Sequence, residues 1–472
     1  MITLTLAEVA EIVGGQLNGD PHIRVDSVEF DSRKVTPHTL FVALRGARVD
    51  GHDFATSVDG PVLAARPVDA PSVVVPHIDN PQSNADAYAH DPSGDNASVL
   101  EALSKLARYN IDHADVTVIG VTGSAGKTST KDLIASVVQR LGTTVAPPGS
   151  FNNELGHPYT ALRCDKTTDY LVAELSARGL GHVAHLAQIA PPTIGVVLNV
   201  GTAHLGEFGS REVIAQAKGE LVAALPSTGV AVLNADDSLV TNMPTSAKVV
   251  RFSTTMEADY YATDIQLGEL SQASFVLHTP QHDQAPVNLQ VFGEHQVANA
   301  LAAAAVGVEC GLSVADVAQA LSEHTAASAH RMDVQRCGDV VIIDDAYNAN
   351  PDSMRAGVSA LIDATSKKTW AVLGQMNELG EDADAEHRKL GEYLAERGVD
   401  TLVAVGTSAQ VEALASSARE HGVHTLVASD VQQAVDLVQA ELAPGDAVLV
   451  KASYSDSLWR VAEGLMQLRR SE

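Results

Sequence analysis

A short stretch of the chain has the composition of a phosphate-binding loop. An apolar run over residues 116–121 gives way to glycines and other small residues, and then to Lys127 and Thr128. Small residues let backbone N–H groups approach phosphate oxygens, the lysine adds a full positive charge, and the threonine hydroxyl can bind Mg²⁺. The strict motif has a glycine where Val121 stands. The order of apolar run, small residues, lysine and threonine nevertheless predicts a strand, a phosphate-binding loop and a helix. The alternative is a glycine turn that precedes a helix by chance.

Three ionisable residues follow this loop at positions where they could assist chemistry. Glu174 ends an apolar run at 170–173, and His204 follows another at 194–198. Ligands of open α/β sheets bind beyond the carboxyl ends of the strands, so both side chains are candidates for a site there. The alternatives are a surface glutamate and an ordinary loop or core histidine. Lys218 has, from the pattern alone, the position of a solvated helix lysine.

A second group of polar residues follows the apolar run 340–343. Asp344, Asp345, Tyr347 and Asn348 precede Asn350 and Pro351. This order predicts a turn with many hydrogen-bonding groups that leads into a helix, with Asn350 as the N-cap and the proline in the first helical turn. A capped turn and a binding role are compatible.

Bulk composition excludes several classes of protein. The 472 residues include 59 acidic and 31 basic ones, for a net charge of −28, and only 4% are aromatic. Such a surface repels nucleic acid and anionic lipid, and it offers few stacking platforms. No apolar run reaches the roughly 18 residues of a membrane span, so we expect no membrane insertion. Cys164, Cys310 and Cys337 lack pairing or metal spacing, which indicates buried thiols in a reducing compartment.

The chain divides into three segments, each with strand and helix patterns. Residues 1–112 contain short strands at 27–30, 40–44 and 73–75, helices at 4–13 and 100–109, and a polar stretch, 77–96, that we expect to be a mobile loop without a packed role. Residues 113–327 alternate strands and helices, which predicts a doubly wound, mostly parallel sheet, with antiparallel strands appended at 262–267, 275–278 and 287–292 and a helix at 296–311. Residues 328–472 predict a second α/β unit, with strands at 340–343, 370–373, 401–405, 424–428 and 447–450.

Taken together, these motifs resemble the Mur ligase family of ATP-dependent amide ligases. The resemblance is carried by the phosphate loop, by residues 199–205 and 293–299, and by His330, Arg331 and Met332. Segments 149–156, 344–351 and 372–380 are similar to the family member that adds a D,D-dipeptide. Segments 31–33 and 50–54 extend the resemblance into the first segment.

The resemblance implies a fold and a set of site residues. It implies an α/β protein of three domains: a small N-terminal α/β domain for a UDP-linked substrate, a central P-loop domain with a doubly wound sheet, and a C-terminal Rossmann-like α/β domain. Lys127, Glu174, His204 and Lys218 would be catalytic. Two Mg²⁺ ions would be held, one by Thr128 and Glu174, the other by His204 and a carbamylated Lys218. The ATP-binding residues would be Gly123, Ser124, Ala125, Gly126, Lys127, Thr128, Ser129, Asn299, Arg331, Asp345, Tyr347 and Asn348.

The resemblance also implies substrates. They would be the small molecules UDP-N-acetylmuramoyl-tripeptide and D-alanyl-D-alanine, joined through an acyl phosphate by a cytoplasmic monomer in peptidoglycan precursor synthesis. Substrate-binding residues would be Ser32, Arg33, Asn152, Asn153 and Arg178. The chain departs from the family at Tyr454, where an arginine is common, and at Trp459, where an acidic residue is common.

Three other functions remain to be weighed. A sibling Mur ligase or a folylpolyglutamate synthetase would share the ATP-binding motifs, but the segments 151–154 and 347–351 argue against both. A P-loop switch or binding module would hydrolyse nucleotide slowly, without turnover that depends on an amine. A catalytically dead scaffold would require the loss of Lys127, Glu174 or His204, and all three are present.

Overall fold

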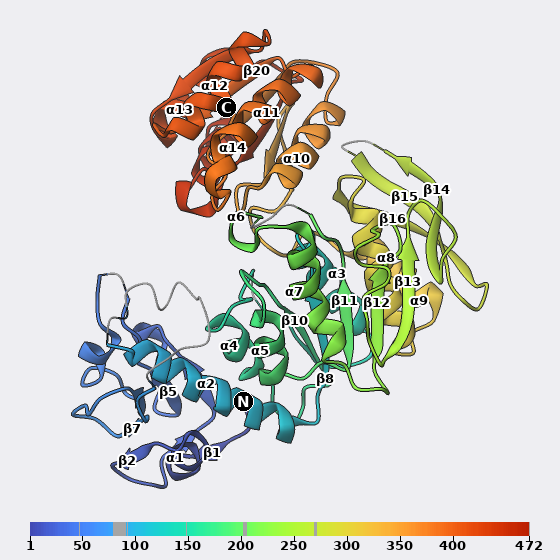
Figure 1. Ribbon diagram of the computed structural model, residues 1–472. Helices are drawn as coiled ribbons and strands as arrows, with labels where there is room; N and C mark the ends of the chain where they lie inside the picture. Colours follow the sequence, from blue (N-terminus) through green and yellow to red (C-terminus); the bar gives the residue numbers. More distant parts are fainter. Residues whose placement is uncertain are drawn as a thin grey trace.

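The computed structural model folds into three bodies arranged in chain order (Figure 1). It describes residues 1–46, 48–78, 91, 93–147, 149–201, 205–268 and 271–471. The N-terminal domain lies at one end, the central domain in the middle, and the C-terminal domain at the other end. No helix within these described ranges is long and apolar enough to cross a membrane.

The N-terminal domain is built on a small sheet with strand order β2-β7-β6-β5-β4, in which only the β2–β7 pair is antiparallel. The strands β1 and β3 form a separate antiparallel pair. Its helix α1 begins at a capping box between Thr5 and Glu8 and ends at Gly14. The elements are β1 (Leu4–Thr5), α1 (Leu6–Val13), β2 (Gln16–Asn18), β3 (Arg24–Val25), β4 (Ser27–Glu29), β5 (Thr39–Val42), β6 (Val62–Ala64), β7 (Ser72–Val74) and α2 (Asp95–Ala114).

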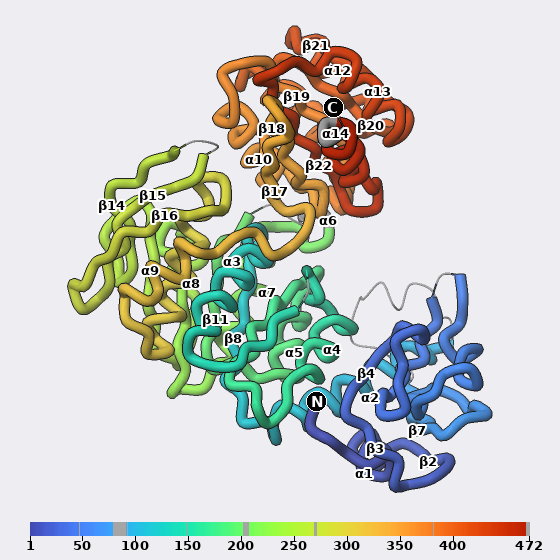
Figure 2. Tube along the Cα trace, turned by 180° about the vertical axis from the view of Figure 1, so that it is seen from behind, coloured from blue at the N-terminus to red at the C-terminus, as the bar shows by residue number. Residues whose placement is uncertain are grey.

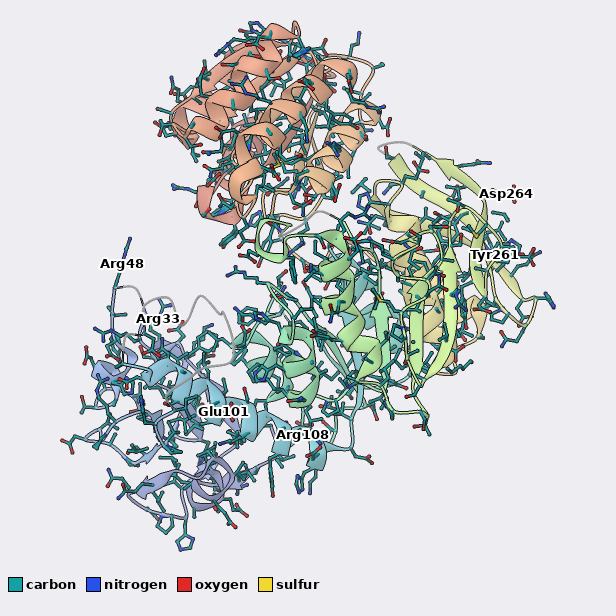
Figure 3. All side chains as sticks on the ribbon, viewed as in Figure 1. Arg33, Arg48, Glu101, Arg108, Tyr261 and Asp264 are labelled. Carbon is teal, nitrogen blue, oxygen red and sulfur yellow. The ribbon has the colours of Figure 1, made fainter. Side chains whose placement is uncertain are left out.

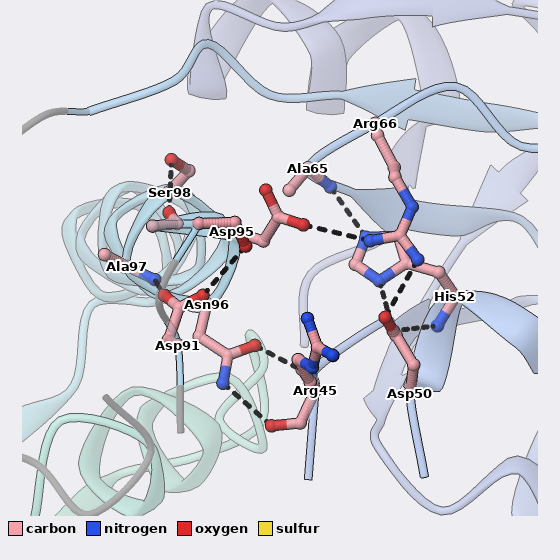
Figure 4. A network of polar contacts seen from close by, with 12 residues as sticks. Arg45, Asp50, His52, Ala65, Arg66, Asp91, Asp95, Asn96, Ala97 and Ser98 are labelled. Atoms are coloured by element: carbon pink, nitrogen blue, oxygen red, sulfur yellow. Dashed lines mark hydrogen bonds and ion pairs between the residues drawn. The ribbon is translucent and has the colours of Figure 1, made fainter. Parts of the chain in front are cut away.

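The start of α2 is tied to the N-terminal sheet by a polar network (Figure 4). Arg66 bonds both Asp50, at 2.8 Å, and Asp95, at 2.9 Å. The Asn96 side chain is buried and pairs with both backbone groups of Arg45. The prediction that 77–96 has no packed role is therefore wrong at its C-terminal end, because these side chains satisfy buried backbone groups. Residues 79–90 and 92 lie outside the described residues.

The central domain contains a nine-stranded sheet within the described ranges, ordered β16-β15-β14-β13-β12-β11-β8-β10-β9. Strands β9 to β14 are parallel, and β15 and β16 are antiparallel to their neighbours. The strands are β8 (Thr117–Thr122), β9 (Thr144–Val145), β10 (Tyr170–Glu174), β11 (Ile194–Val197), β12 (Val230–Asn234), β13 (Lys248–Ser253), β14 (Tyr260–Leu267), β15 (Gln272–His278) and β16 (Gln284–Phe292).

The helices of the central domain cover both faces of this sheet. One apolar cluster packs α5 and α7 on one face, and a second packs α3, α8 and α9 on the other. The doubly wound arrangement is therefore confirmed. The expectation that β14 is antiparallel is wrong on one side: it runs parallel to β13, a strand that the pattern did not reveal. The helices are α3 (Lys127–Val138), α4 (Gly156–Ala161), α5 (His182–Ile189), α6 (Leu205–Phe208), α7 (Arg211–Ala223), α8 (Gln296–Glu309) and α9 (Val314–Glu323).

The C-terminal domain, which Figure 2 shows from behind, has its own sheet. Its strand order is β17-β18-β22-β19-β20-β21, and the strands are parallel apart from β17. Apolar clusters lie on both of its faces. The elements are β17 (Asp333–Cys337), β18 (Val340–Asp344), α10 (Pro351–Asp363), β19 (Thr369–Leu373), α11 (Ala383–Glu396), β20 (Thr401–Val405), α12 (Ala409–Glu420), β21 (His424–Ala428), α13 (Val431–Glu441), β22 (Ala447–Lys451) and α14 (Trp459–Ser471).

The connection between the central and C-terminal domains contains two unusual backbone conformations. His330 has φ of 60° and Met332 has φ of 49°. Residues other than glycine seldom adopt these left-handed values, since the Cβ atom crowds the carbonyl oxygen. Both occur in the three-residue motif His330-Arg331-Met332, at the point where the chain enters the C-terminal domain.

Candidate active site

The candidate site begins at the edge of the central sheet where three neighbouring parallel strands end. The strands β11, β8 and β10 are adjacent, in that order, and their carboxyl ends lie at Val197, Thr122 and Glu174. The phosphate loop, the residues that follow Glu174 and the segment from Asn199 therefore come together there. Open α/β sheets bind ligands at this kind of edge.

The phosphate loop is held in shape by Asn199. The Asn199 side-chain oxygen accepts hydrogen bonds from the backbone N–H groups of Ser124, at 3.0 Å, and Ala125, at 2.9 Å. Gly126 has φ of 80°, and a Cβ there would lie 2.7 Å from the Asn299 side-chain oxygen. Asn299 itself is buried on α8. Only glycine fits this conformation and this contact together, which explains the glycine immediately before Lys127.

Lys127 lies at the start of α3, inside the loop. Its ammonium donates to the carbonyl of Gly123 at 2.9 Å. Removal from water lowers the pKa of Lys127 below its usual value, and Arg331 lowers it further, whereas Glu174 opposes the change. The helix N-terminus and this cation form a local positive site in a strongly acidic protein.

Glu174 lies at the centre of a compact oxygen-rich cluster. Its side chain is buried, at 1% exposure. The Thr128 hydroxyl donates to one carboxylate oxygen at 2.8 Å, and the Asn152 amide donates to the other, also at 2.8 Å. Ser150 is 2.9 Å from the Thr128 hydroxyl. The alternative of a surface glutamate is wrong. Adjacent hydroxyl and carboxylate oxygens are ligands that suit Mg²⁺.

Lys218 is buried on α7, at 4% exposure, so the pattern-based description of a solvated lysine is wrong. Burial lowers the pKa of Lys218 to about 7, and the charge of Lys127 contributes to this shift. His204 lies outside the described residues. In the described part of the chain no group of three or more His, Cys, Asp or Glu side chains is placed to hold a metal ion.

The C-terminal domain supplies the opposite wall, again from the carboxyl ends of neighbouring parallel strands. There β18 ends at Asp344, β22 at Lys451 and β19 at Leu373. Lys451 is almost fully buried and donates to the Asp345 carboxylate at 2.6 Å and to the carbonyl of Asn348 at 2.8 Å. Burial raises the pKa of Asp344, against the effect of His330, which lies 2.7 Å away.

Aromatic and cationic side chains cover this second wall. The guanidinium of Arg331 lies 4.1 Å from the centre of the Tyr347 ring and donates to Ser150 of the central domain. Tyr454 packs on the ring of Tyr347, and the two ring centres are 5.2 Å apart. Trp459 stacks on His330 at 5.2 Å. The two positions at which the chain departs from the family pattern are therefore both in contact with this wall.

The two walls enclose one cleft with a volume of about 650 Å³. Of the predicted site residues, it brings together the phosphate loop with Glu174, Asn152, Asn153, Arg178, Asn299, Arg331, Asp345, Tyr347 and Asn348. Gly123, Ser32, Arg33 and Lys218 are not among its lining residues. Arg33 lies on the N-terminal domain, with its side chain 86% exposed and paired with Asp31 (Figure 3).

The N-terminal domain meets the cleft region through an aromatic contact. Phe30, two residues before the predicted residue Ser32, packs on Tyr159 and Phe151, with ring centres 4.9 and 6.4 Å away. Phe151 directly precedes Asn152, whose amide holds Glu174. Asn153 accepts a hydrogen bond from Gly156 at 2.9 Å and so helps to start α4.

Sequence reasoning did not identify Asn199 and Lys451 as structural supports of the site. Asn199 follows a buried strand directly, which is the signal that could have marked it. Lys451 ends a strand of apolar residues, where an isolated lysine needs a buried partner. None of the three cysteines forms a disulfide; Cys164 and Cys337 are buried and Cys310 is partly exposed.

Comparison with known proteins identifies the family. The Mur ligase middle domain matches residues 121–307, the Mur ligase glutamate ligase domain matches 330–454, and the domain described as Mur ligase family, catalytic domain matches 24–110. The chain is also 51% identical to UDP-N-acetylmuramoyl-tripeptide--D-alanyl-D-alanine ligase of Mycobacterium tuberculosis, over 99% of this chain and 98% of that protein. The chain belongs to the Mur ligase family.

Solved structures of Mur ligases agree over the whole length. MurF from Acinetobacter baumannii superposes with a TM-score of 0.84 at 30% identity, covering 98% of this chain and 99% of that one. MurF from Thermotoga maritima, solved in complex with ADP, superposes with a TM-score of 0.77 at 27% identity, covering 95% and 98%. The three-domain α/β architecture expected of a Mur ligase is therefore confirmed. The exact domain boundaries, 112/113 and 327/328, stay predictions, and the first of them falls inside α2.

Proposed function

We propose that this Mur ligase catalyses the ATP-dependent addition of D-alanyl-D-alanine to UDP-N-acetylmuramoyl-tripeptide, the last peptide-adding step of peptidoglycan precursor synthesis. The observation that carries this assignment is the full-length likeness, at 51% identity, to a ligase of that name. It is supported by a single cleft in which a phosphate loop faces a second, nucleotide-sized wall.

ATP would bind across the two walls. Its phosphates would lie on the loop from Gly123 to Ser129, where backbone N–H groups, the α3 N-terminus and Lys127 supply positive charge. Asn299, Arg331, Asp345, Tyr347 and Asn348 would contact the remainder of the nucleotide. The Thermotoga maritima protein, which has the same fold and was solved in complex with ADP, supports nucleotide binding by this chain.

Two Mg²⁺ ions would offset the charge of the phosphates. Thr128 and Glu174 would hold one ion, and their adjoining oxygens, 2.8 Å apart, suit a hard cation. His204 and a carbamylated Lys218 would hold the other. A carbamate forms when a neutral amine adds CO₂ and loses a proton. The burial of Lys218 and its pKa of about 7 favour the neutral amine that this reaction needs. Bound Mg²⁺ would stabilise the negative charge that develops on the transferring phosphoryl group.

The reaction would proceed in two steps. The free carboxylate of the tripeptide's third residue attacks the γ-phosphate, which forms an acyl phosphate and releases ADP. The amine of D-alanyl-D-alanine then attacks the acyl carbon, forms the amide bond, releases inorganic phosphate and loses a proton. The protein would act mainly by positioning the reactants and by balancing charge through Lys127.

Substrate contacts would come from the N-terminal and central domains. Ser32 and Arg33 would bind the UDP-linked substrate from the N-terminal domain, and Asn152, Asn153 and Arg178 would bind it near the cleft. We further propose that the enzyme is a cytoplasmic monomer. A single sedimentation species of one-chain mass, unchanged by either substrate, is the result expected for a monomer.

A competition assay tests the substrate assignment. The enzyme would receive ATP, UDP-N-acetylmuramoyl-tripeptide and an equimolar mixture of D-alanyl-D-alanine, D-alanine, L-lysine, diaminopimelate and D-glutamate, with products read by mass spectrometry. We expect the dipeptide adduct to dominate, since a site that pairs a peptide amide and its carboxylate rejects ligands that lack one of them. A dominant single-amino-acid adduct would indicate a sibling ligase. Steady ATP hydrolysis without any adduct would indicate a nucleotide switch.

A further inference from the structure

One ion pair in the cleft joins the two walls. The guanidinium of Arg178, four residues after Glu174, lies 2.9 Å from the carboxylate of Glu378 in the C-terminal domain. The two side chains are 34% and 35% exposed, so water reaches both. Ion pairs of this exposure are weak, because solvent screens them and two long side chains must be ordered. A ligand with suitable charges can therefore replace either partner.

Glu378 is presented by a loop that is unusually well fixed. Four consecutive backbone N–H groups before it each have an acceptor: Gly374 bonds the Lys451 carbonyl, Gln375 the Asp456 carboxylate, Met376 the His387 ring and Asn377 the Ser453 hydroxyl, at 3.0 to 3.1 Å. These acceptors come from the end of β22, from the segment after it and from α11. The position of Glu378 is thus set by the domain core and not by its contact with Arg178.

The backbone at Glu378 is strained, with φ of 65°. Glycine or asparagine would adopt this conformation at lower cost. Strained residues of other types are typical of sites where the side chain has a function. A glutamate that bears this cost inside the cleft is a candidate for a functional side chain.

The other carboxylates of the cleft are occupied by groups of their own domain or packed against backbone. Among the described lining residues the acidic ones are Glu174, Asp345, Asp352 and Glu378. Glu174 accepts from Thr128 and Asn152, and Asp345 pairs with buried Lys451. The Asp352 carboxylate packs against Gly201, where an added Cβ would lie 2.5 Å from it. Glu378 differs from Glu174 and Asp345 because its ion pair crosses the cleft, to Arg178 of the central domain.

We propose that Glu378 binds the α-ammonium group of the incoming dipeptide, and that Arg178 holds its place when the dipeptide is absent. This inference rests on the proposed function, because it assigns a binding residue to the amine substrate. A zwitterionic dipeptide enters a cleft that also contains Lys127, Arg178, Arg331 and Lys451. Its ammonium would be repelled by these cations, so a carboxylate near the reacting end is needed to bind it.

Kinetics of Glu378→Gln test the inference, with Glu386→Gln as the control. Glu386 forms an exposed ion pair with Lys389 at 2.7 Å on α11, outside the cleft. We expect Glu378→Gln to raise KM for D-alanyl-D-alanine by about 10- to 100-fold, the range expected when a charged hydrogen bond is lost. KM for ATP and for the UDP-tripeptide should change less than about twofold, and the control should match the parent. An unchanged KM for the dipeptide would overturn the inference.

A probe without the ammonium separates recognition of charge from loss of structure. D-lactoyl-D-alanine carries a hydroxyl in place of the amine and keeps the carboxylate. Its inhibition constant should be the same for the parent and Glu378→Gln, since it has no ammonium to lose. Glu378→Gly should relieve the strain and raise Tm, yet raise KM for the dipeptide as the Gln variant does. An equal weakening of both ligands would contradict ammonium binding.

A charge exchange tests the simpler alternative, in which the pair only fastens the two domains. The double variant Arg178→Glu/Glu378→Arg retains opposite charges across the cleft. A fastening role predicts recovery of the dipeptide KM in this variant, which would overturn the inference, whereas ammonium binding predicts no recovery. The assay also separates the two proposals: a parent enzyme that adds no dipeptide at all refutes the proposed function, while normal dipeptide KM in Glu378→Gln refutes only this inference.

Discussion

The two walls of the cleft share a strand arrangement but differ in how far apart in the sequence their bonded residues lie. Each uses the carboxyl ends of three adjacent parallel strands. The central wall has a local motif at its centre, since Gly123, Lys127 and Thr128 lie within six residues and bond one another or the nearby Glu174. The C-terminal wall is held together by residues that are far apart in the sequence, since Lys451 bonds Asp345, 106 positions away.

This difference separates what each wall contributes. The central wall has the charges and oxygens that would act on phosphate under the proposed function, whereas the C-terminal wall has rings and paired charges that would hold a ligand in place. Loss of a group from the central wall should therefore reduce kcat. Loss of a group from the C-terminal wall should alter stability or the binding of a substrate. Four variants, taken from the largest expected effect to the smallest, test this division.

Lys127→Ala removes the loop cation from the central wall. We expect kcat to fall by about 100- to 1000-fold, because a preorganised charge that stabilises the transition state is lost. Tm should stay close to that of the parent, since the ammonium bonds only one loop carbonyl in its own wall. Amide formation is measured by mass spectrometry, and Lys105→Ala on the surface of α2 serves as the control. Near-normal turnover of folded Lys127→Ala would refute its role.

Lys218→Ala tests the carbamate on the same side of the cleft. Turnover should fall by about 100-fold and recover in part with a small carboxylic acid, which replaces the lost anionic oxygens. The parent enzyme should lose activity in CO₂-free buffer as the pH falls below about 7. Since the pKa of Lys218 is about 7, a lower pH protonates the amine, and the ammonium cannot add CO₂. Full activity without bicarbonate and an unmodified lysine by intact mass would contradict this prediction.

Lys451→Met tests the C-terminal wall. It leaves the Asp345 carboxylate, 14% exposed, without its ion-pair partner. Breaking a buried pair on one side costs about 3 kcal/mol of unfolding free energy, because a charge remains buried alone. Urea unfolding measures the loss, and Lys389→Met, from an exposed pair, should cost less than about 1 kcal/mol. The double variant Lys451→Met/Asp345→Asn should regain part of the stability. Equal stability of Lys451→Met and the parent would be inconsistent with a structural role.

Tyr454→Ala should have the smallest effect. It removes the ring that packs on Tyr347 at 5.2 Å, while the guanidinium of Arg331 remains in place. An aromatic pair contributes about 0.5–1.5 kcal/mol, and the side chain of Tyr454 is half exposed, so we expect KM for ATP to rise about two- to fivefold with kcat unchanged. Tyr454→Phe keeps the ring and should match the parent. A fall in kcat with constant KM would place Tyr454 in the chemistry instead.

The same contrast explains how much of the structure could be read from the sequence. Buried strands followed by small residues locate the phosphate loop, Glu174 and the turn at 344–351, because hydrophobic periodicity and turn-forming residues can be recognised within a short stretch of sequence. Asn350 caps α10 with Pro351 in the first turn, as predicted. Neither the burial of Lys218 nor the bond from Lys451 to Asp345 has a local signal, since each depends on how separate elements pack. The strand β13 was missed because Lys248 and Arg251 interrupt its apolar pattern.

The left-handed residues at the domain joint limit the ways in which the C-terminal domain can be oriented. His330 and Met332 occupy a narrow backbone energy well that lies far from the broad extended and helical wells. A joint made of glycines would rotate through a continuous range. At His330 and Met332 the backbone changes conformation only by leaving one well for another, so these two residues do not contribute a continuous range of rotation to the joint. The backbone torsions of His330 and Met332 therefore help to set the orientation of the C-terminal wall relative to the central wall.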